Sequence, residues 1–323
     1  MVSRPKGERS AIPLPAAENG GEERAVRERL RAPVRWFGGK GKMLAKLMRH
    51  VPKGGRPYCE PYMGASSLFF AREPAPVEVL NDLDGDLVNL FRCLQDKATF
   101  EELKHRIRYT LYARAEFGRA IEILKKENET DPVQRAWAFF VVKNQGVSGT
   151  AKTVGNWSRT FISAGGSANN TNKWMMRLSM LDDWHLRLLR AQIDNRDALE
   201  VIRYWDTPDT VFYVDPPYHQ DTRKSKHVYA AEQDHDHHVQ LVETLLACSG
   251  AVVLSGYDHP VYSPLAEAGW TATRYQTACH AAGKVRGSKL KGAGSAHLNV
   301  PRVEVVWANQ KAVEALTSPP MSE

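Results

Sequence analysis

Residues 211–218 read Val211-Phe212-Tyr213-Val214-Asp215-Pro216-Pro217-Tyr218. The first four side chains are apolar and either β-branched or aromatic, a composition that predicts a strand buried on both faces, as in a parallel sheet. An acidic residue and two prolines follow this strand directly. Because ligands of open parallel sheets collect beyond the carboxyl ends of the strands, the tetrapeptide 215–218 lies where chemistry is expected.

This tetrapeptide also carries groups suited to holding an amine. The two prolines fix φ and remove two backbone donors, which leaves the Pro216 carbonyl free to accept a hydrogen bond. Together with the Asp215 carboxylate it can accept both hydrogens of an –NH2 group and stabilise positive charge on an attacking nitrogen. Tyr218 offers a flat face for a base flipped out of the duplex. The alternative is a rigid turn that ends a strand; the complete motif after a buried strand favours function.

Strand and helix patterns alternate on both sides of this segment. Strands that alternate with helices are the signature of a parallel α/β sheet. We therefore expect an α/β fold with a mixed, mainly parallel sheet and helices on both faces. Apolar runs predict strands at residues 58–62, 77–80, 251–255 and 303–307, and helical spacing predicts helices at 43–50, 66–70, 87–94 and 239–246.

The alternation is interrupted between residues 100 and 180. Charged residues 101–126 and aromatic-rich residues 132–144 are typical of helices, whereas residues 146–172 are rich in Gly, Ser, Thr and Asn and predict a loop or hairpin. We expect this insertion to be a mostly helical target-recognition subdomain. The predicted division is a flexible leader 1–32, a catalytic domain formed by 33–100 and 181–311, the subdomain 101–180, and a tail 312–323.

Composition restricts the class of protein. Lys and Arg (44) outnumber Asp and Glu (37), and the net charge of +7 favours a polyanionic partner such as nucleic acid. The four cysteines are far apart and form no CxxC pair, so neither a zinc site nor a disulfide framework is predicted. No apolar run approaches the roughly 20 residues that span a bilayer, and the N-terminus lacks a signal-peptide pattern. We expect a cytoplasmic protein without membrane contact.

Three further segments, read with Asp215–Tyr218, resemble the Dam-type (class alpha) adenine-N6 DNA methyltransferases over residues 34–309. This resemblance implies a Rossmann-like methyltransferase fold, the cofactor S-adenosylmethionine and a DNA substrate with a flipped adenine. It is carried in order by a cofactor motif, a first strand with its glycine turn, and a second strand end. The segments are Trp36-Phe37-Gly38-Gly39-Lys40, Tyr58-Cys59-Glu60-Pro61-Tyr62-Met63-Gly64 and Leu80-Asn81-Asp82.

The resemblance also implies roles for single residues. Asp82 would bind the ribose hydroxyls, and Asp197 would accept from the cofactor's adenine amino group. Helix capping is an alternative for both, although Asp84 is also placed to cap the helix that follows Asp82. The implied cofactor-binding set is Trp36, Gly38, Gly39, Lys40, Tyr58, Gly64, Asp82, Asp197 and Asp215, and the implied catalytic set is Asp215, Pro216 and Tyr218.

Several features leave alternatives open. The family's glycine turn often carries two or three glycines, but here Gly64 is followed by Ala65-Ser66-Ser67, which puts the fit around the methionine part in question. Segments 255–258 and 304–309 resemble later strand ends, for which we expect structural support. Histidines 235 and 238 stand at i, i+3 without a third ligand, so we predict no metal, a helix cap at Asp234 or Asp236, and histidines that face solvent or DNA.

Two basic segments are candidate DNA contacts. Residues 280–302 form a Gly-rich cationic stretch suited to phosphates, and residues 143–174 hold amides and cations of the kind that read base edges. A plain surface loop is an equal alternative for the first. The candidates are Lys143, Asn144, Arg159, Lys173, Lys284, Arg286, Lys289 and Lys291.

The sequence thus predicts a site-specific DNA methyltransferase acting on adenine N6. Cytosine-N4 methylation is a near alternative because the same pocket handles any exocyclic amine, although cytosine-N4 enzymes more often have Ser in place of this Asp. A non-enzymatic DNA-binding or decoy protein with the same fold is the alternative from another class. The recognised DNA word, a role alone or in a restriction–modification pair, and the oligomeric state stay open.

Overall fold

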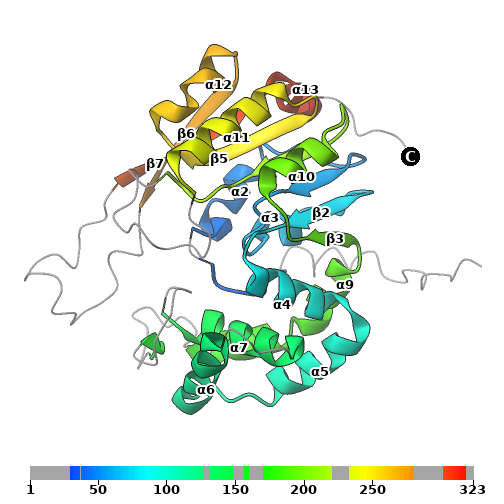
Figure 1. Cartoon of the computed structure of the whole chain (residues 1–323), viewed down its shortest axis with the longest axis vertical. Coiled ribbons are helices and arrows are strands. Elements are labelled where there is room, and N and C mark those ends of the chain that lie inside the picture. The colour runs from blue at the N-terminus through cyan, green and yellow to red at the C-terminus, as the bar shows by residue number, and fades with distance from the viewer. Residues whose placement is uncertain are drawn as a thin grey trace, which may run out of the picture.

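The fold is built on a seven-stranded mixed sheet (Figure 1). This computed structural model describes residues 30–36, 38–126, 131–147, 156–159, 170–219, 233–278 and 301–317. The strand order is β3-β2-β1-β4-β5-β7-β6; β7 runs antiparallel to both neighbours and the other pairs are parallel. The strands are β1 (Tyr58–Glu60), β2 (Glu78–Asn81), β3 (Ala191–Asp194), β4 (Val211–Val214), β5 (Ala251–Tyr257), β6 (Thr271–Ala278) and β7 (Pro301–Ala308).

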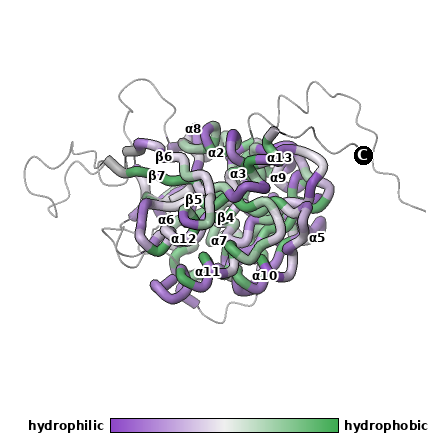
Figure 2. The backbone as a smooth tube through the Cα atoms, turned by 90° about the horizontal axis from the view of Figure 1, so that it is seen from above, coloured by the Kyte–Doolittle hydropathy of each residue, from purple (hydrophilic) through white to green (hydrophobic). Residues whose placement is uncertain are grey.

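Each face of the central strands has its own hydrophobic cluster. Side chains alternate in direction along a strand, so Val211 and Tyr213 of β4 enter one cluster while Phe212 and Val214 enter the other. All four residues of β4 are buried. Figure 2 shows hydrophobic segments gathered around β4 and β5 and hydrophilic ones at the periphery. The prediction of a strand buried on both faces is confirmed.

Helices cover both faces of the sheet. On the face toward Phe212 lie α10 (Ala198–Trp205), α11 (His235–Ala247), the short η4 (Pro260–Tyr262) and α12 (Ser263–Glu267). The opposite face is covered by η1 (Lys40–Lys42), α2 (Leu44–Leu47), α3 (Ser67–Ala71), α4 (Gly85–Gln95), α9 (Leu181–Leu188) and α13 (Gln310–Thr317). The expected α/β methyltransferase architecture is confirmed.

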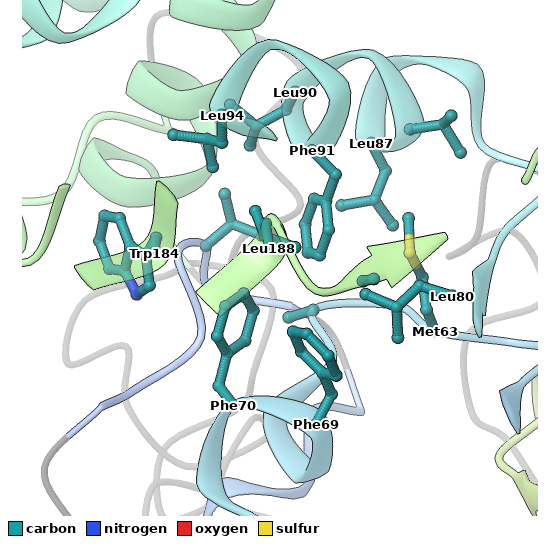
Figure 3. Close-up of a cluster of buried hydrophobic side chains, with 14 of the residues drawn as sticks. Met63, Phe69, Phe70, Leu80, Leu87, Leu90, Phe91, Leu94, Trp184 and Leu188 are labelled. Carbon is teal, nitrogen blue, oxygen red and sulfur yellow. The ribbon is translucent and has the colours of Figure 1, made fainter. Parts of the chain in front are cut away.

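The insertion is helical and lies to one side of the sheet (Figure 1). It contains α5 (Lys97–Arg108), α6 (Arg114–Lys125), α7 (Pro132–Gln145) and α8 (Asn170–Leu178). Its core is continuous with that of the sheet, because Phe100 of α5, Phe140 of α7 and Trp174 of α8 belong to one cluster with residues of α3, α4 and α9. Figure 3 shows part of this cluster, with Phe69 and Phe70 of α3, Phe91 of α4, and Trp184 and Leu188 of α9. The predicted domain boundaries stay predictions.

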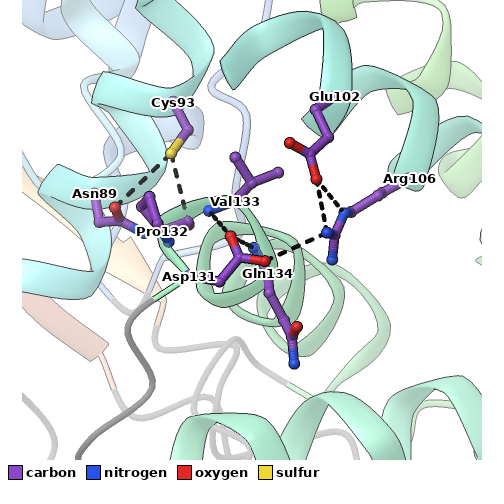
Figure 4. A network of polar contacts seen from close by, with 8 residues as sticks. All are labelled: Asn89, Cys93, Glu102, Arg106, Asp131, Pro132, Val133 and Gln134. Atoms are coloured by element: carbon purple, nitrogen blue, oxygen red, sulfur yellow. Dashed lines mark hydrogen bonds and ion pairs between the residues drawn. The ribbon is translucent and has the colours of Figure 1, made fainter. Parts of the chain in front are cut away.

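Polar contacts fix the helices of the insertion against α4 (Figure 4). Asp131 caps α7 by accepting hydrogen bonds from the backbone N–H groups of Val133 and Gln134 at 2.9 and 3.0 Å. Arg106 of α5 also pairs with Asp131 at 3.3 Å, and Cys93 of α4 donates to the Pro132 carbonyl at 3.6 Å. These bonds tie three helices together at the start of α7.

Several local predictions differ from the structure. The helix expected at 43–50 is the short helix α2 at Leu44–Leu47, which follows the 3-10 turn η1, and the region 101–126 holds two helices separated at residues 109–113. The sequence pattern predicted no strand at β3 or β6, which are the two edges of the sheet. Edge strands are partly exposed, so their hydrophobic pattern is weaker than that of β4.

Candidate active site

A pocket of about 920 Å³, counted to its open mouth, lies at the carboxyl ends of β1, β2 and β4. Parallel strands direct their terminal loops to the same edge, which brings segments distant in sequence together. The N-terminal glycine turn, the loop after each strand and the start of α10 all contribute. Its lining includes Trp36, Gly38, Gly39, Lys40, Glu60, Tyr62, Gly64, Ser66, Asn81, Asp82, Leu83, Arg196, Asp197, Tyr213, Asp215, Pro216 and Gln233.

The turn after β1 brings the backbone close to the Trp36 ring. Gly64 has φ +47, and a Cβ at this position would lie 3.0 Å from Trp36 Nε1. Two residues later, Ser66 also adopts a left-handed conformation with φ 51, which non-glycine residues rarely do. Ser66 therefore keeps a glycine-like backbone, and the turn is formed without a second glycine.

Asp82 connects this turn to the end of β2. Its Oδ2 accepts from the Gly64 backbone N–H and its Oδ1 from that of Asp84, both at 2.9 Å. Burial raises the pKa of Asp82 to about 6, although these backbone donors oppose the shift. Asp84, and not Asp82, caps α4 through the backbone N–H groups of Asp86 and Leu87. Asp82 therefore remains available to line the pocket.

Asp197 caps a helix and also lines the pocket. Its Oδ1 caps α10 by accepting from the backbone N–H of Leu199 at 2.8 Å, and the residue also lines the pocket. The preceding loop is held by Asn81, whose side chain donates to the Arg196 carbonyl at 3.0 Å and accepts from the Arg196 N–H at 2.9 Å. The cap fixes the direction of the carboxylate at the pocket wall.

Asp215 is oriented through one of its two oxygens. Its Oδ1 accepts from Lys40 Nζ at 2.6 Å and from Ser255 Oγ at 2.9 Å, and Ser255 Oγ lies 3.1 Å from Tyr213 Oη. Within the described part of the chain, no hydrogen bond reaches Oδ2. Burial raises the pKa of Asp215, and the Lys40 ammonium only partly offsets this effect. The second oxygen is therefore available to accept from an amine.

Lys40 is buried, with its ammonium between two carboxylates. Besides Asp215, its Nζ lies 3.3 Å from Glu304 Oε1, and it also donates to the Tyr218 hydroxyl. Burial alone would lower the pKa of Lys40, but Asp215 and Glu304 together raise it above its ordinary value. Lys40 is thus a fixed cation at the pocket edge, not the surface lysine that was its alternative.

Tyr218 is buried beside the pocket and does not line it. Its ring is 6% exposed; Lys40 Nζ lies 4.5 Å from the ring centroid and the Tyr257 ring 4.3 Å away. Its hydroxyl donates to Glu304. This corrects the expectation that Tyr218 offers an open face for a base, because the hydroxyl anchors the ring inside.

Two other expected site residues are buried supports. Tyr58 is 1% exposed and donates to Glu60 Oε1 at 2.7 Å, so it stands behind the pocket wall and does not contact a ligand directly. Asn144, a candidate reader of base edges, is 7% exposed and donates to the Pro33 carbonyl at 3.0 Å. It faces inward because it lies on the buried side of α7.

The remaining candidate DNA contacts fall into two groups. Arg159 and Lys173 are exposed, and their segments are joined by Asn170 Nδ2, which donates to the Ser158 carbonyl at 3.0 Å. Lys143 is half-buried and lies 4.3 Å from the Trp36 ring centroid. Candidates Lys284, Arg286, Lys289 and Lys291 lie outside the described residues.

The histidine-rich segment differs in part from expectation. Asp234 caps α11, as one of the two alternatives stated, but His238 is fully buried rather than facing solvent or DNA. The reason is helical spacing: His238, Leu241 and Leu245 share the face that packs on the sheet. His238 Nδ1 lies 3.0 Å from Tyr262 Oη. Within the described residues, no group of three or more His, Cys, Asp or Glu side chains is arranged to hold a metal.

Sequence reasoning missed two groups of residues at this site. Ser255 and Glu304 were expected to give only structural support, yet they contact Asp215 and Lys40 respectively. Glu60 and Gln233 line the pocket from buried positions. A charged residue in the apolar run 303–307 was the available signal for Glu304, because a buried charge needs a partner.

These features define a Rossmann-like methyltransferase: parallel strands ending at a pocket, acidic residues after β2 and β3, and Asp-Pro-Pro-Tyr after β4. More specifically, residues 36–261 match the family of D12 class N6 adenine-specific DNA methyltransferases, and the chain belongs to that family. Within the described residues, no helix has the length and apolar character needed to cross a membrane.

Individual relatives match a shorter stretch. The DNA adenine methylase of Salmonella typhi is 29% identical over 124 residues, which is 38% of this chain and 43% of that protein. The DNA N-6-adenine-methyltransferase of Escherichia phage P1 is 29% identical over 123 residues, which is 38% of this chain and 16% of that protein. A Type II methyltransferase of Lactococcus lactis subsp. cremoris is 33% identical over 67 residues, covering 21% of this chain and 23% of that protein. The match thus spans less than half the length of these relatives.

Proposed function

We propose that this protein transfers a methyl group from S-adenosylmethionine to N6 of a flipped adenine in DNA. The observation that carries the proposal is the placement of Asp215 in one pocket with Trp36 and Asp82. Its Oδ1 is held by Lys40 and Ser255. A carboxylate fixed in this way can accept a hydrogen from an exocyclic amine without rearranging.

The lining of the pocket fits the chemistry of the proposed cofactor. Asp82 can accept from vicinal hydroxyls, and Asp197 can accept from an amino group. Trp36 provides an aromatic wall beside Gly64. When bound, S-adenosylmethionine supplies a methyl group activated by a sulfonium, which the amine nitrogen takes up. The nitrogen would attack the methyl carbon directly as the carbon–sulfur bond breaks, so the leaving sulfur would become a neutral thioether and no covalent bond to the enzyme would form.

The residues of the chain then act by positioning. Asp215 Oδ2 and the Pro216 carbonyl accept the two amine hydrogens and orient the nitrogen lone pair toward the pocket. Positive charge that develops on this nitrogen is stabilised by the Asp215 carboxylate, which also lies beside the departing proton. Holding two reactants in this geometry can account for about 7–11 kcal/mol of the barrier. Tyr218 supports this arrangement from behind.

We propose double-stranded DNA with a short specific sequence as the partner. Arg159 and Lys173 are exposed cations on adjoining segments of the insertion. Such cations bind DNA phosphates, and the affinity that they contribute falls as the salt concentration rises. Lys143 lies next to Trp36, where it can link the DNA-facing side to the cofactor motif. We propose the cytoplasm as the compartment of this activity.

The test is transfer of labelled methyl groups to unmodified genomic DNA by wild type and by Asp215→Ala. We expect the variant to lose at least about 100-fold in kcat while its affinity for DNA stays unchanged. Asp236→Ala, which removes an exposed carboxylate of α11, is the matched control and should stay fully active. Nucleoside analysis should show N6-methyladenine; N4-methylcytosine, or full activity of Asp215→Ala, would refute the proposal.

A further inference from the structure

Four side chains from separate parts of the chain meet behind the Asp-Pro-Pro-Tyr motif. Lys40 follows the glycine turn, Asp215 and Tyr218 follow β4, and Glu304 lies on β7. Lys40 Nζ is 2.6 Å from Asp215 Oδ1 and 3.3 Å from Glu304 Oε1. The Tyr218 hydroxyl accepts from Lys40 and donates to Glu304. Glu304 therefore holds both groups that stand beside Asp215.

The antiparallel strand explains how Glu304 reaches this place. Glu304 pairs in register with Tyr257 at the carboxyl end of β5. Because β7 runs opposite to β5, the first residues of β7 lie at the edge of the sheet where the parallel strands end. Tyr257 in turn packs its ring on Tyr218 at 4.3 Å. The antiparallel direction of β7 thus places a carboxylate near its start beside the site.

A role limited to packing does not account for this residue. Glu304 is 6% exposed and its neighbours Val305 and Val306 are 0% and 1% exposed, so an apolar side chain would fill the position without a desolvation cost. A buried carboxylate is retained only at considerable cost unless it is paired and hydrogen-bonded. Here it is both, and its partners are two residues of the proposed active site.

We propose that Glu304 is a positioning residue for methyl transfer: it holds the Lys40 ammonium and the Tyr218 hydroxyl so that Asp215 is bound through Oδ1 and presents Oδ2 to the amine. This inference rests on the proposed function. With one cation between two carboxylates, the group retains a net negative charge beside the nitrogen that becomes positive. Glu304 does not itself line the pocket, so it acts through Lys40 and Tyr218.

The charge of Glu304 also affects the titration of Asp215. Asp215 is faced by Lys40 from η1, Ser255 from β5 and Glu304 from β7, with the Tyr213 and Tyr262 phenols nearby. Burial raises the pKa of Asp215 and Lys40 lowers it, while Glu304 contributes a further rise. Removal of the Glu304 charge should therefore lower the pKa of Asp215.

The experiment compares Glu304→Gln with wild type in steady-state methyl transfer to unmodified genomic DNA. Gln keeps an acceptor for the Tyr218 hydroxyl but removes the charge. We expect kcat to fall at least about tenfold while KM for S-adenosylmethionine changes less than about threefold. The acidic limb of the kcat profile should move to lower pH. Glu304→Asp, which retains the charge, should recover part of kcat.

Control variants separate this role from a loss of folding. Glu243→Gln removes an exposed carboxylate of α11 and should match wild type in kcat and pH profile. If Glu304→Gln does not fold, Tyr218→Phe removes the hydroxyl between Glu304 and Lys40, and kcat should fall at least about fivefold. The double variant Glu304→Gln/Tyr218→Phe should have a kcat no lower than that of the less active single variant, because both substitutions disturb the same group of Lys40, Tyr218 and Glu304.

The outcomes are distinct. A folded Glu304→Gln enzyme with wild-type kcat and an unmoved pH profile would overturn the inference while leaving the proposed function intact. Full activity of Tyr218→Phe, where Glu304→Gln does not fold, would overturn it equally. If wild type transfers no methyl group to any DNA, the proposed function fails and the inference fails with it.

Discussion

At the scale of single residues, the turn after β1 is the most constrained point of the pocket. Gly64 and Ser66 both have positive φ, and a left-handed conformation costs a non-glycine residue about 1–2 kcal/mol. Ser66 is 2% exposed and its Oγ donates to the Met63 carbonyl at 3.4 Å, which offsets part of that cost. The backbone conformation, and not the number of glycines, is what the cofactor turn requires.

The first prediction concerns Gly64→Ala. The new Cβ would lie 3.0 Å from Trp36 Nε1 on a backbone with φ +47, so the ring must shift by a few tenths of an ångström and the turn becomes strained. We expect affinity for S-adenosylmethionine to fall at least about tenfold, equivalent to about 1.4 kcal/mol, as measured by calorimetric titration. Gly41→Ala, where an added Cβ meets nothing within 4 Å, should bind as wild type does. Equal affinities for the two variants would contradict this account of the turn.

At the scale of elements, the segment before Trp36 is fastened to the helical insertion. Trp184 Nε1 donates to the Arg31 carbonyl at 2.6 Å, and Arg177 donates to the Ala32 and Pro33 carbonyls, each at 2.9 Å. Asn144 makes a fourth bond to the same segment, at the Pro33 carbonyl. Helices α7, α8 and α9 therefore all form hydrogen bonds with the segment that leads into Trp36.

A second prediction follows for Arg177→Met. Burial lowers the pKa of Arg177 to about 10, with Arg35 and Arg31 lowering it further, so the residue is still charged at neutral pH. Its loss leaves the Ala32 carbonyl without this donor, while the Pro33 carbonyl keeps its bond from Asn144, and an unsatisfied buried group costs about 1–3 kcal/mol. We expect lower thermal stability and a several-fold weaker affinity for S-adenosylmethionine, because Trp36 follows the loosened segment.

The matched control is Arg114→Met, which changes an exposed arginine of α6. It should leave both quantities unchanged. If Arg177→Met is destabilised but binds S-adenosylmethionine with wild-type affinity, the hydrogen bonds from Arg177 to the segment before Trp36 have no influence on cofactor binding.

At the scale of the whole molecule, buried acids connect the pocket to folding stability. Glu60 is 1% exposed and accepts from Tyr58 Oη at 2.7 Å and the Phe69 N–H at 2.9 Å. Burial raises the pKa of Glu60 from 4.5 to about 7, although these hydrogen bonds oppose the shift. The folded chain therefore binds a proton that the unfolded chain has lost between pH 4.5 and 7.

We predict that Glu60→Gln raises the free energy of unfolding, relative to wild type, by more as the pH rises. The contribution of the wild-type carboxyl is fully present below pH 4.5 and is lost as the pH rises through 7, so ionised Glu60 weakens the fold by on the order of 3 kcal/mol at pH 8. The stability difference between Glu60→Gln and wild type should grow from pH 5 to pH 8 in urea denaturation. Glu101→Gln, an exposed change on α5, should show a constant difference. A constant difference for Glu60→Gln as well would mean that its pKa is not raised.

The sequence alone was sufficient for the central strands and for most of the pocket. β4 is recognisable because a strand buried on both faces must be apolar throughout, and Asp215 follows it directly. The resemblance to the Dam-type family pointed to Gly64, Asp82 and Asp197, which also line the pocket. Gly64 and Asp82 follow strands that the neighbouring residues define by themselves, whereas β3 before Asp197 has too weak a pattern to be recognised.

Only the tertiary structure decided what surrounds these residues. The edge strands β3 and β6 have weak patterns because half of each is exposed, and Glu304 reaches Lys40 because β7 is antiparallel. The burial of Tyr218 likewise depends on Tyr257 and Glu304, which lie about 40 and 86 residues further along the chain. Local sequence specifies which group a strand end carries; which partners it meets depends on the order and direction of strands, and that is set by the packing of the whole chain.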